Sequence, residues 1–156
     1  MKPDSTIKEQ SLNPRLKGRQ QTQALAGAEK LDEPILLALH AASDKKAIDL
    51  VVLDLRDVAS FTDYFLITSG ANERQVQAIA DGISDTLKKV GSAAARVEGY
   101  KTAEWILLDY GDFVVHVFEQ KARSFYDLER LWRESKRVEL PPELNLERVS
   151  SLRRES

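Results

Sequence analysis

Residues 48–69 read IDLVVLDLRDVASFTDYFLITS and contain two short apolar runs joined by a polar connector. The runs at 48–55 and 64–69 are rich in branched and aromatic side chains and too short for buried helices, so they predict two β-strands. Asn72 follows the second run, and the apolar positions after it recur at intervals of three or four up to Val90. This spacing predicts a helix that Asn72 caps and that Gly91 ends.

The flanking segments extend this pattern on both sides. Pro34 and the apolar spacing after it predict a helix that begins at Asp32 or Glu33 and ends near residue 46. Residues 94–97, 104–109 and 113–119 predict three further strands, and the turn at 110–112 between the last two predicts a hairpin.

A final helix is expected near the end of the domain, with Ser124 as its N-cap. Its apolar stripe would consist of Phe125, Leu128, Leu131 and Trp132, and we expect Trp132 to pack in the core. The order helix, two strands, helix, three strands, helix predicts an α/β fold with a mixed five-stranded sheet flanked by helices.

Composition restricts the class of protein. A chain of 156 residues with 42% hydrophobic residues has the size of one ordinary domain. The absence of cysteine excludes disulfides, thiolate metal ligands and thiol catalysis. No apolar window approaches the roughly 18 residues of a membrane span, and residues 1–10 lack a secretory apolar run. We therefore expect a soluble, cytoplasmic protein without membrane contacts.

Charge is distributed unevenly along the chain. Residues 1–30 carry a net charge of +3, residues 31–140 carry −5, and residues 141–156 are neutral. An acidic central domain has no excess of cations with which to neutralise phosphates, so we expect little or no direct binding of nucleic acid. A basic protein is the better partner for it.

The two ends of the chain are polar. Residues 1–30 show neither helical nor alternating periodicity over most of their length and are interpreted as a flexible tail. A contact between this tail and RNA is the alternative that its charge allows. Pro141 and Pro142 end the preceding helix, and 141–156 are interpreted as a polar C-terminal tail. The domain itself would then span residues 31–140.

Several blocks of residues 33–140 together resemble the ribosomal silencing factor family, also called RsfS, Iojap or YbeB. They are TDYFLITSG at 62–70, NERQVQAIAD at 72–81, VEG at 97–99 with EWILLDYGD at 104–112, VVHVF at 114–118, and RSFYDLERLW at 123–132. Gln75 departs from the pattern, because many relatives carry His there. This departure casts doubt only on a chemistry that would depend on a His at position 75.

The resemblance implies a translation repressor and not an enzyme. Members of the family bind the large ribosomal subunit through a basic ribosomal protein of the uL-fourteen kind and sterically block joining of the small subunit. Their fold is similar to that of nucleotidyltransferases without the catalytic carboxylates. No cofactor and no metal ion is implied.

A nucleotide-binding or nucleotidyltransferase-like enzyme is the alternative, and it would use Asp54, Asp63 and the turn at Gly70. A helix N-terminus after that turn could hold a phosphate, but an ordinary helix cap needs the same residues. Asp54 and Asp57 are three residues apart at a strand end, a spacing that does not put both on one face for metal binding. His116 is expected to be hydrogen-bonded packing, and His40 has no second imidazole at ligand spacing.

A partner-binding patch is predicted on the strand 104–109. Trp105, Leu107 and Asp109 should share one face, while Glu104, Ile106 and Leu108 share the other, so both faces carry large apolar groups. From the residues alone, core and interface remain equally open for Trp105; the resemblance favours an interface. The predicted binding residues are Glu98, Tyr100, Trp105, Leu107, Asp109 and Asp112, whose acids would suit a basic partner.

Self-association is a further alternative. An apolar patch that serves one partner can also pair two copies, so a homodimer through the hairpin sheet or the last helix would compete with ribosome binding.

Overall fold

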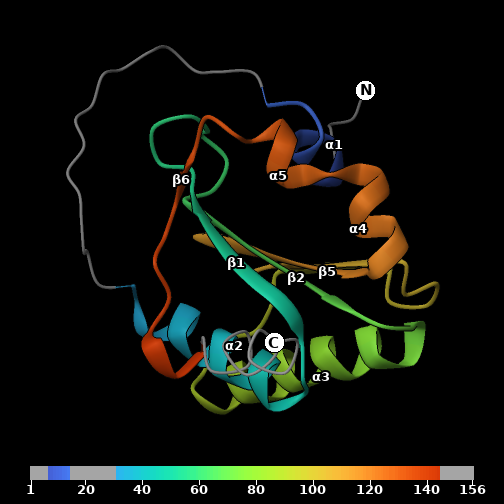
Figure 1. Ribbon diagram of the computed structural model, residues 1–156. Coiled ribbons are helices and arrows are strands. Elements are labelled where there is room, and N and C mark those ends of the chain that lie inside the picture. Colours follow the sequence, from blue (N-terminus) through green and yellow to red (C-terminus); the bar gives the residue numbers. More distant parts are fainter. Residues whose placement is uncertain (1–6, 15–30, 145–156) are drawn as a thin grey trace, which may run out of the picture.

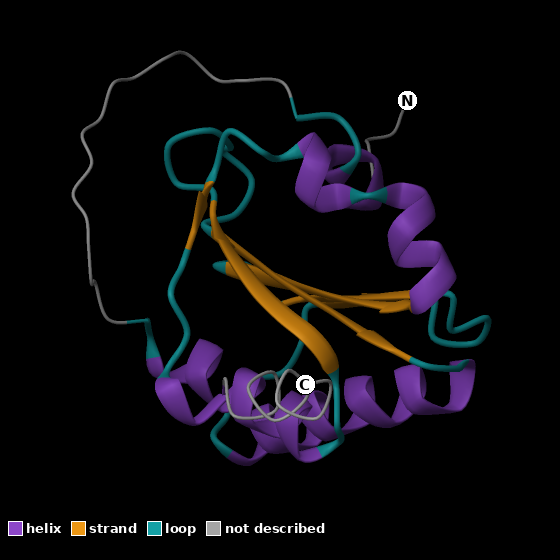
Figure 2. Cartoon of the chain, in the orientation of Figure 1, coloured by secondary structure: helices purple, strands orange, loops and turns teal. Residues whose placement is uncertain are grey.

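The computed structural model describes residues 7–14 and 31–144, which form a central sheet between two layers of helices (Figures 1 and 2). Helices α2 (Glu33–Asp44) and α3 (Glu73–Lys89) cover one face of the sheet, which we call the inner face. The other face, the outer face, carries α1 (Ile7–Ser11), α4 (Gln120–Tyr126) and α5 (Leu128–Leu131). The predicted α/β architecture is confirmed.

The sheet is mixed and has the strand order β3-β4-β5-β2-β1-β6. The strands are β1 (Ile48–Asp54), β2 (Tyr64–Gly70), β3 (Arg96–Glu98), β4 (Trp105–Asp109), β5 (Phe113–Glu119) and β6 (Lys136–Arg137). Only the β2–β5 pair is parallel. The expected count of five strands was wrong, because two-residue β6, which pairs with the end of β1, is too short to show any periodicity.

Side chains alternate along the strands and so supply two apolar cores. On β4, Ile106 and Leu108 pack toward α2 and α3, whereas Trp105 and Leu107 belong to the outer core under α4 and α5. The predicted division of this strand is confirmed. Both faces are covered by helices, which is why β2, β4 and β5 read as nearly continuous apolar runs.

The predicted helix ends around α3 are also confirmed. The Asn72 side chain accepts a hydrogen bond from the Gln75 amide at 2.9 Å, and Gly91 adopts a φ of 82° just after the helix. Gln75 itself has a structural role, since its side-chain nitrogen donates to the carbonyls of Lys45 and Lys46.

The final helix differs from its prediction. It begins at Gln120, where the Glu119 carboxylate accepts hydrogen bonds from the amides of Lys121 and Ala122, so Ser124 is not its cap. Asp127 then adopts a left-handed φ of 49° and separates α4 from α5. This break divides the expected stripe: Leu128 and Trp132 are buried, but Phe125 is 79% exposed.

Part of the segment that was predicted to be a flexible tail is ordered against the outer face. Ser11 is buried, and its carbonyl accepts a hydrogen bond of 2.6 Å from Trp132 Nε1. Ile7 and Leu12 pack on the outer core. The tail prediction is therefore wrong for residues 7–14, while 1–6, 15–30 and 145–156 lie outside the described residues.

Candidate partner-binding site on the outer face

An aromatic cluster occupies the end of the outer face where β4 begins. The Trp105 ring lies 5.0 Å from that of Phe118 and 4.7 Å from that of Tyr126, measured between centroids. Its indole Nε1 donates a 3.0 Å hydrogen bond to His116 Nδ1. We call Trp105, His116, Phe118 and Tyr126 the Trp105 cluster; exposed Phe125 extends it to the surface through an edge contact with Tyr126.

His116 is an uncharged member of this cluster. Its burial, with a smaller effect from the positive charge of Lys8, lowers the pKa of His116 to about 3. Because Nδ1 accepts the bond from Trp105, the proton of the neutral ring is on Nε2, for which the described residues offer no hydrogen-bond acceptor. The predicted role of His116 as hydrogen-bonded packing is confirmed.

Lys8 of α1 covers the cluster from outside. Its Nζ donates a 2.9 Å hydrogen bond to the Trp105 carbonyl and lies 4.7 Å from the centroid of the Trp105 ring, a cation–π arrangement. Gly99, with a φ of 78°, leaves room for both groups, since a Cβ there would come within 2.1 Å of the Trp105 oxygen and 2.9 Å of Lys8 Nζ. We call this space, bounded by Gly99 and the carbonyl and ring of Trp105, the ammonium niche.

Two carboxylates set the electrostatics of the ammonium niche. Burial lowers the pKa of Lys8, while attraction from Glu98 and Glu104 acts in the opposite direction. The Glu98 carboxylate also lies 3.9 Å from the Arg96 guanidinium, so its negative charge is shared between Lys8 and Arg96. The residues that form the niche are therefore suited to a basic side chain: one carbonyl acceptor, one aromatic face and two acids.

The six predicted binding residues do not form one surface. Leu107 is fully buried and Trp105 is 5% exposed, so neither presents a free surface while α1 is in place. Tyr100 faces the inner layer, where its hydroxyl donates to Asp81 of α3 at 3.0 Å. Of the six, the structure brings only Trp105 and Glu98 to the niche.

Asp109 and Asp112 lie at the far end of β4, at the hairpin turn. Asp109 is four residues, about 13 Å, along the strand from Trp105, and its carboxylate accepts a bond from the Gly111 amide. Both acids therefore belong to the turn and are separate from the ammonium niche.

Sequence analysis missed Lys8 and Glu104 as members of the site. Glu104 was assigned to the face opposite Trp105, but β4 begins only at Trp105, so strict alternation does not apply to it. Lys8 is 97 positions from Trp105 in a segment without periodicity, and no local signal indicates the contact.

Of the residues of the alternative nucleotide site, Asp54 and Asp63 lie side by side, because Asp54 pairs with Tyr64, but Gly70 lies at the opposite end of β2. Asp63 precedes β2 and Gly70 ends it, which separates them by about 23 Å. Burial acts to raise the pKa of Asp54. Hydrogen bonds and the positive charge of Arg56 outweigh burial and hold this pKa below its ordinary value. Gly70 allows close packing on Val76 of α3. Within 7–14 and 31–144, no three His, Asp or Glu side chains gather in a way that could hold a metal ion.

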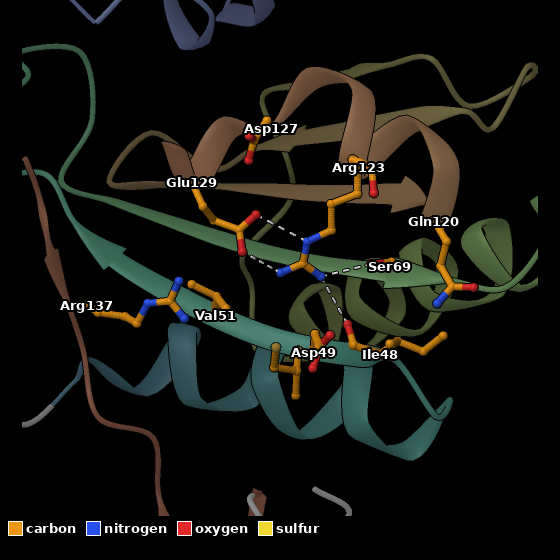
Figure 3. A pocket seen from close by; sticks show the side chains of 11 residues that line it. Ile48, Asp49, Val51, Ser69, Gln120, Arg123, Asp127, Glu129 and Arg137 are labelled. Carbon is orange, nitrogen blue, oxygen red and sulfur yellow. Dashed lines mark hydrogen bonds and ion pairs between the residues drawn. The ribbon is translucent and has the colours of Figure 1, made fainter. Parts of the chain in front are cut away.

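A polar cavity of about 430 Å³ also opens on the outer face, beside β1 and α4 (Figure 3). Arg123 dominates it: its guanidinium donates to both oxygens of Glu129, to Ser69 Oγ at 2.8 Å and to the Ile48 carbonyl at 3.2 Å. These bonds join β1, β2, α4 and α5. The cavity therefore surrounds a structural junction whose cation is already paired.

The fold and the niche define a class of protein: a helix-covered, mixed-sheet α/β domain whose outer face accommodates a basic side chain. Its sequence matches the family model "Ribosomal silencing factor during starvation", RsfS, over residues 28–156. The chain belongs to the ribosomal silencing factor family. Helix α1 precedes the matched residues.

Individual relatives agree with this assignment. The chain is 44% identical over 108 residues to ribosomal silencing factor RsfS of Halalkalibacterium halodurans, covering 69% of this chain and 92% of that protein. It is 38% identical over 114 residues to the chloroplastic protein Iojap of Zea mays, covering 73% of this chain and 49% of that one.

Solved structures share the fold. A crystal structure from Bacillus halodurans superposes with a TM-score of 0.63 at 44% identity, covering 69% of this chain and 98% of that one. A crystal structure from Chromobacterium violaceum superposes with a TM-score of 0.65 at 34% identity, covering 72% of this chain and 91% of that one. In the described part of the chain, every helix is too short or too polar to cross a membrane.

Proposed function

We propose that this protein represses translation by binding the large ribosomal subunit and that, once bound, its bulk blocks joining of the small subunit. The partner is a basic ribosomal protein of the uL-fourteen kind, contacted by the outer face around Trp105. Membership of a family named for ribosomal silencing supports the general role. No bond is made or broken in this mechanism.

The observation that carries the proposed contact is the occupied ammonium niche. The chain's own Lys8 shows that the Trp105 ring and carbonyl, with Glu98 and Glu104 nearby, accept a basic side chain. Ribosomal proteins that contact RNA phosphates carry many such side chains. Charge complementarity would also speed association and fix the orientation of the bound protein.

Exposed Phe125 provides the apolar part of this contact. A phenyl ring that is 79% exposed gains little from the folded monomer, whereas aromatic side chains are frequent anchors in protein interfaces. Phe125 contacts Tyr126, which contacts Trp105, so the three rings form a continuous path from the surface to the niche.

Two surface substitutions test the proposal: Glu104→Arg and Phe125→Ala. Each should weaken co-sedimentation with purified large subunits about tenfold, because an interface anchor commonly contributes more than 1 kcal/mol. Glu104→Arg also removes an attraction to Lys8, but a partner with several basic side chains loses more from the reversed charge than the single Lys8 ammonium does, so the net effect is weaker binding. Since both residues are exposed, thermal unfolding should be nearly unchanged.

Matched controls lie on α3 and at its C-cap, on the opposite side of the sheet. Asp85→Arg reverses an exposed acid and Val90→Ala trims an apolar side chain that is 57% exposed. Both controls should bind like the wild type. If the controls lose binding while Glu104→Arg and Phe125→Ala retain it, the outer face is not the contact surface.

A further inference from the structure

We propose that helix α1 is an intramolecular cover of the binding site: in the free protein Lys8 fills the ammonium niche that a lysine or arginine of the ribosomal partner fills in the complex. Binding then requires α1 to leave the outer face. This inference concerns regulation of the same site and rests on the proposed function.

First, the chemistry of the Lys8 contact also suits a lysine of the partner. A partner lysine would make the same interactions as Lys8, namely a hydrogen bond to the Trp105 carbonyl, a cation–π contact with its ring, and attraction to Glu98 and Glu104. Two ammonium groups cannot share a space bounded so closely by Gly99 and Trp105. Occupation by Lys8 and by the partner is therefore mutually exclusive.

Second, α1 is an addition to the family domain. The family match begins at residue 28, whereas α1 spans Ile7–Ser11. The two solved structures match 69% and 72% of this chain, and the match takes in 98% and 91% of their own length. The shared fold therefore needs no further N-terminal segment.

Third, α1 is a short element that the outer face holds in place. A helix of five residues is not stable by itself, so its order depends on docking. The contacts that hold it include the Lys8 interactions, the bond from Trp132 Nε1 to the Ser11 carbonyl, and packing of Ile7 and Leu12 on the outer core. Burial of the Lys8 charge opposes part of this stabilisation. A cover held in this way can open without unfolding the sheet.

The opening equilibrium has a measurable consequence. If only a fraction of free molecules has α1 undocked, the apparent affinity for the partner is reduced by that fraction. Weakening the cover should then tighten binding, which is the opposite of what loss of an interface residue does.

The test measures the affinity of full-length variants for purified large ribosomal subunits. Lys8→Ala should bind about tenfold more tightly than the wild type, since a partly buried cation–π contact contributes on the order of 1–2 kcal/mol. Leu12→Ala should also tighten binding, although it removes no charge, because it weakens the docking of the same helix.

Two controls accompany these variants. Lys88→Ala removes an exposed lysine from α3 and Asn13→Ala trims an exposed side chain beside α1; both should bind like the wild type. Hydrogen exchange provides a second readout: amides at 8–13 should exchange faster in the wild-type complex than in the free protein.

The outcomes separate the two proposals. If the wild type binds large subunits but Lys8→Ala and Leu12→Ala bind equally or more weakly, the cover is refuted and the proposed function is retained. If neither the wild type nor Lys8→Ala binds large subunits, the proposed function itself is refuted. The proposed competition between Lys8 and the partner is then refuted as well.

Discussion

Trp105 connects three parts of the molecule at the level of single side chains. Its indole nitrogen bonds His116 of the neighbouring strand, its ring packs on Tyr126 of α4, and its carbonyl receives the Lys8 ammonium of α1. A residue with this many partners contributes to stability, and under the proposed function Trp105 would also contribute to binding. Truncation of Trp105 would change both, which is why exposed Glu104 and Phe125 are the better probes of the interface.

His116 makes folding dependent on pH. Its pKa is about 3 in the folded protein, below the ordinary value of 6.5 in the unfolded chain, so protons bind the unfolded state first as the pH falls. The contribution of neutral His116 to the free energy of unfolding is complete above pH 6.5 and is lost as the pH falls toward 3. We predict that the free energy of unfolding decreases between pH 7 and pH 5 with a slope of up to about 1.4 kcal/mol per pH unit from this group.

Urea unfolding at several pH values checks this prediction. His116→Gln keeps an acceptor for Trp105 but cannot titrate, and it should flatten the slope between pH 7 and pH 5. The control His40→Gln, at an exposed position on α2, should retain it. An unchanged slope in His116→Gln would contradict the assignment of the pH dependence to this buried ring.

At the scale of elements, the end of β5 determines how α4 is placed. Glu119 caps α4, and the left-handed Asp127 ends it before α5. This geometry leaves Phe125 exposed while Ala122 and Leu128 are buried. The exposed aromatic of the proposed interface is thus a consequence of where one short helix begins and ends.

Removal of the cap tests this placement. Glu119→Ala should lower the free energy of unfolding by about 0.5–2 kcal/mol, because two helix amides lose their acceptor. Ser124→Ala, at the position first assigned as the cap, should change it by less than about 0.5 kcal/mol. Equal losses in the two variants would contradict the cap assignment. Chemical denaturation of both proteins supplies the comparison.

The elements that the sequence predicted are those with local signals. Asn72 and Gly91 mark the ends of α3, and the hairpin at Gly111 follows from turn chemistry. By contrast, β6 has two residues and Glu119 is not among the side chains preferred as caps. Docking of α1 depends on contacts about a hundred positions apart, which no periodicity records.

The candidate site was predicted in part for the same reason. Alternation correctly assigned Trp105 to a face, and local charge indicated Glu98. Neither alternation nor local charge indicated that Tyr100 turns toward α3 or that α1 covers β4. These features depend on tertiary packing. The likeness to nucleotidyltransferases and the homodimer remain predictions.

At the scale of the whole molecule, the protein would work by occupying space on the large ribosomal subunit. Under the proposed function, the sheet between two helical layers (Figure 2) would provide the bulk, and the outer face would provide the contact. Helix α1 would hold that contact closed until a basic partner replaces Lys8. Repression would then depend on how much protein is bound, without any catalytic turnover.

Light scattering of purified large and small ribosomal subunits during joining tests this account most directly. Full-length protein, added first to the large subunits, should lower the extent of joining in proportion to its occupancy, and Glu104→Arg should need about tenfold more protein for the same effect. Normal joining of large subunits that are saturated with the wild-type protein would contradict the account.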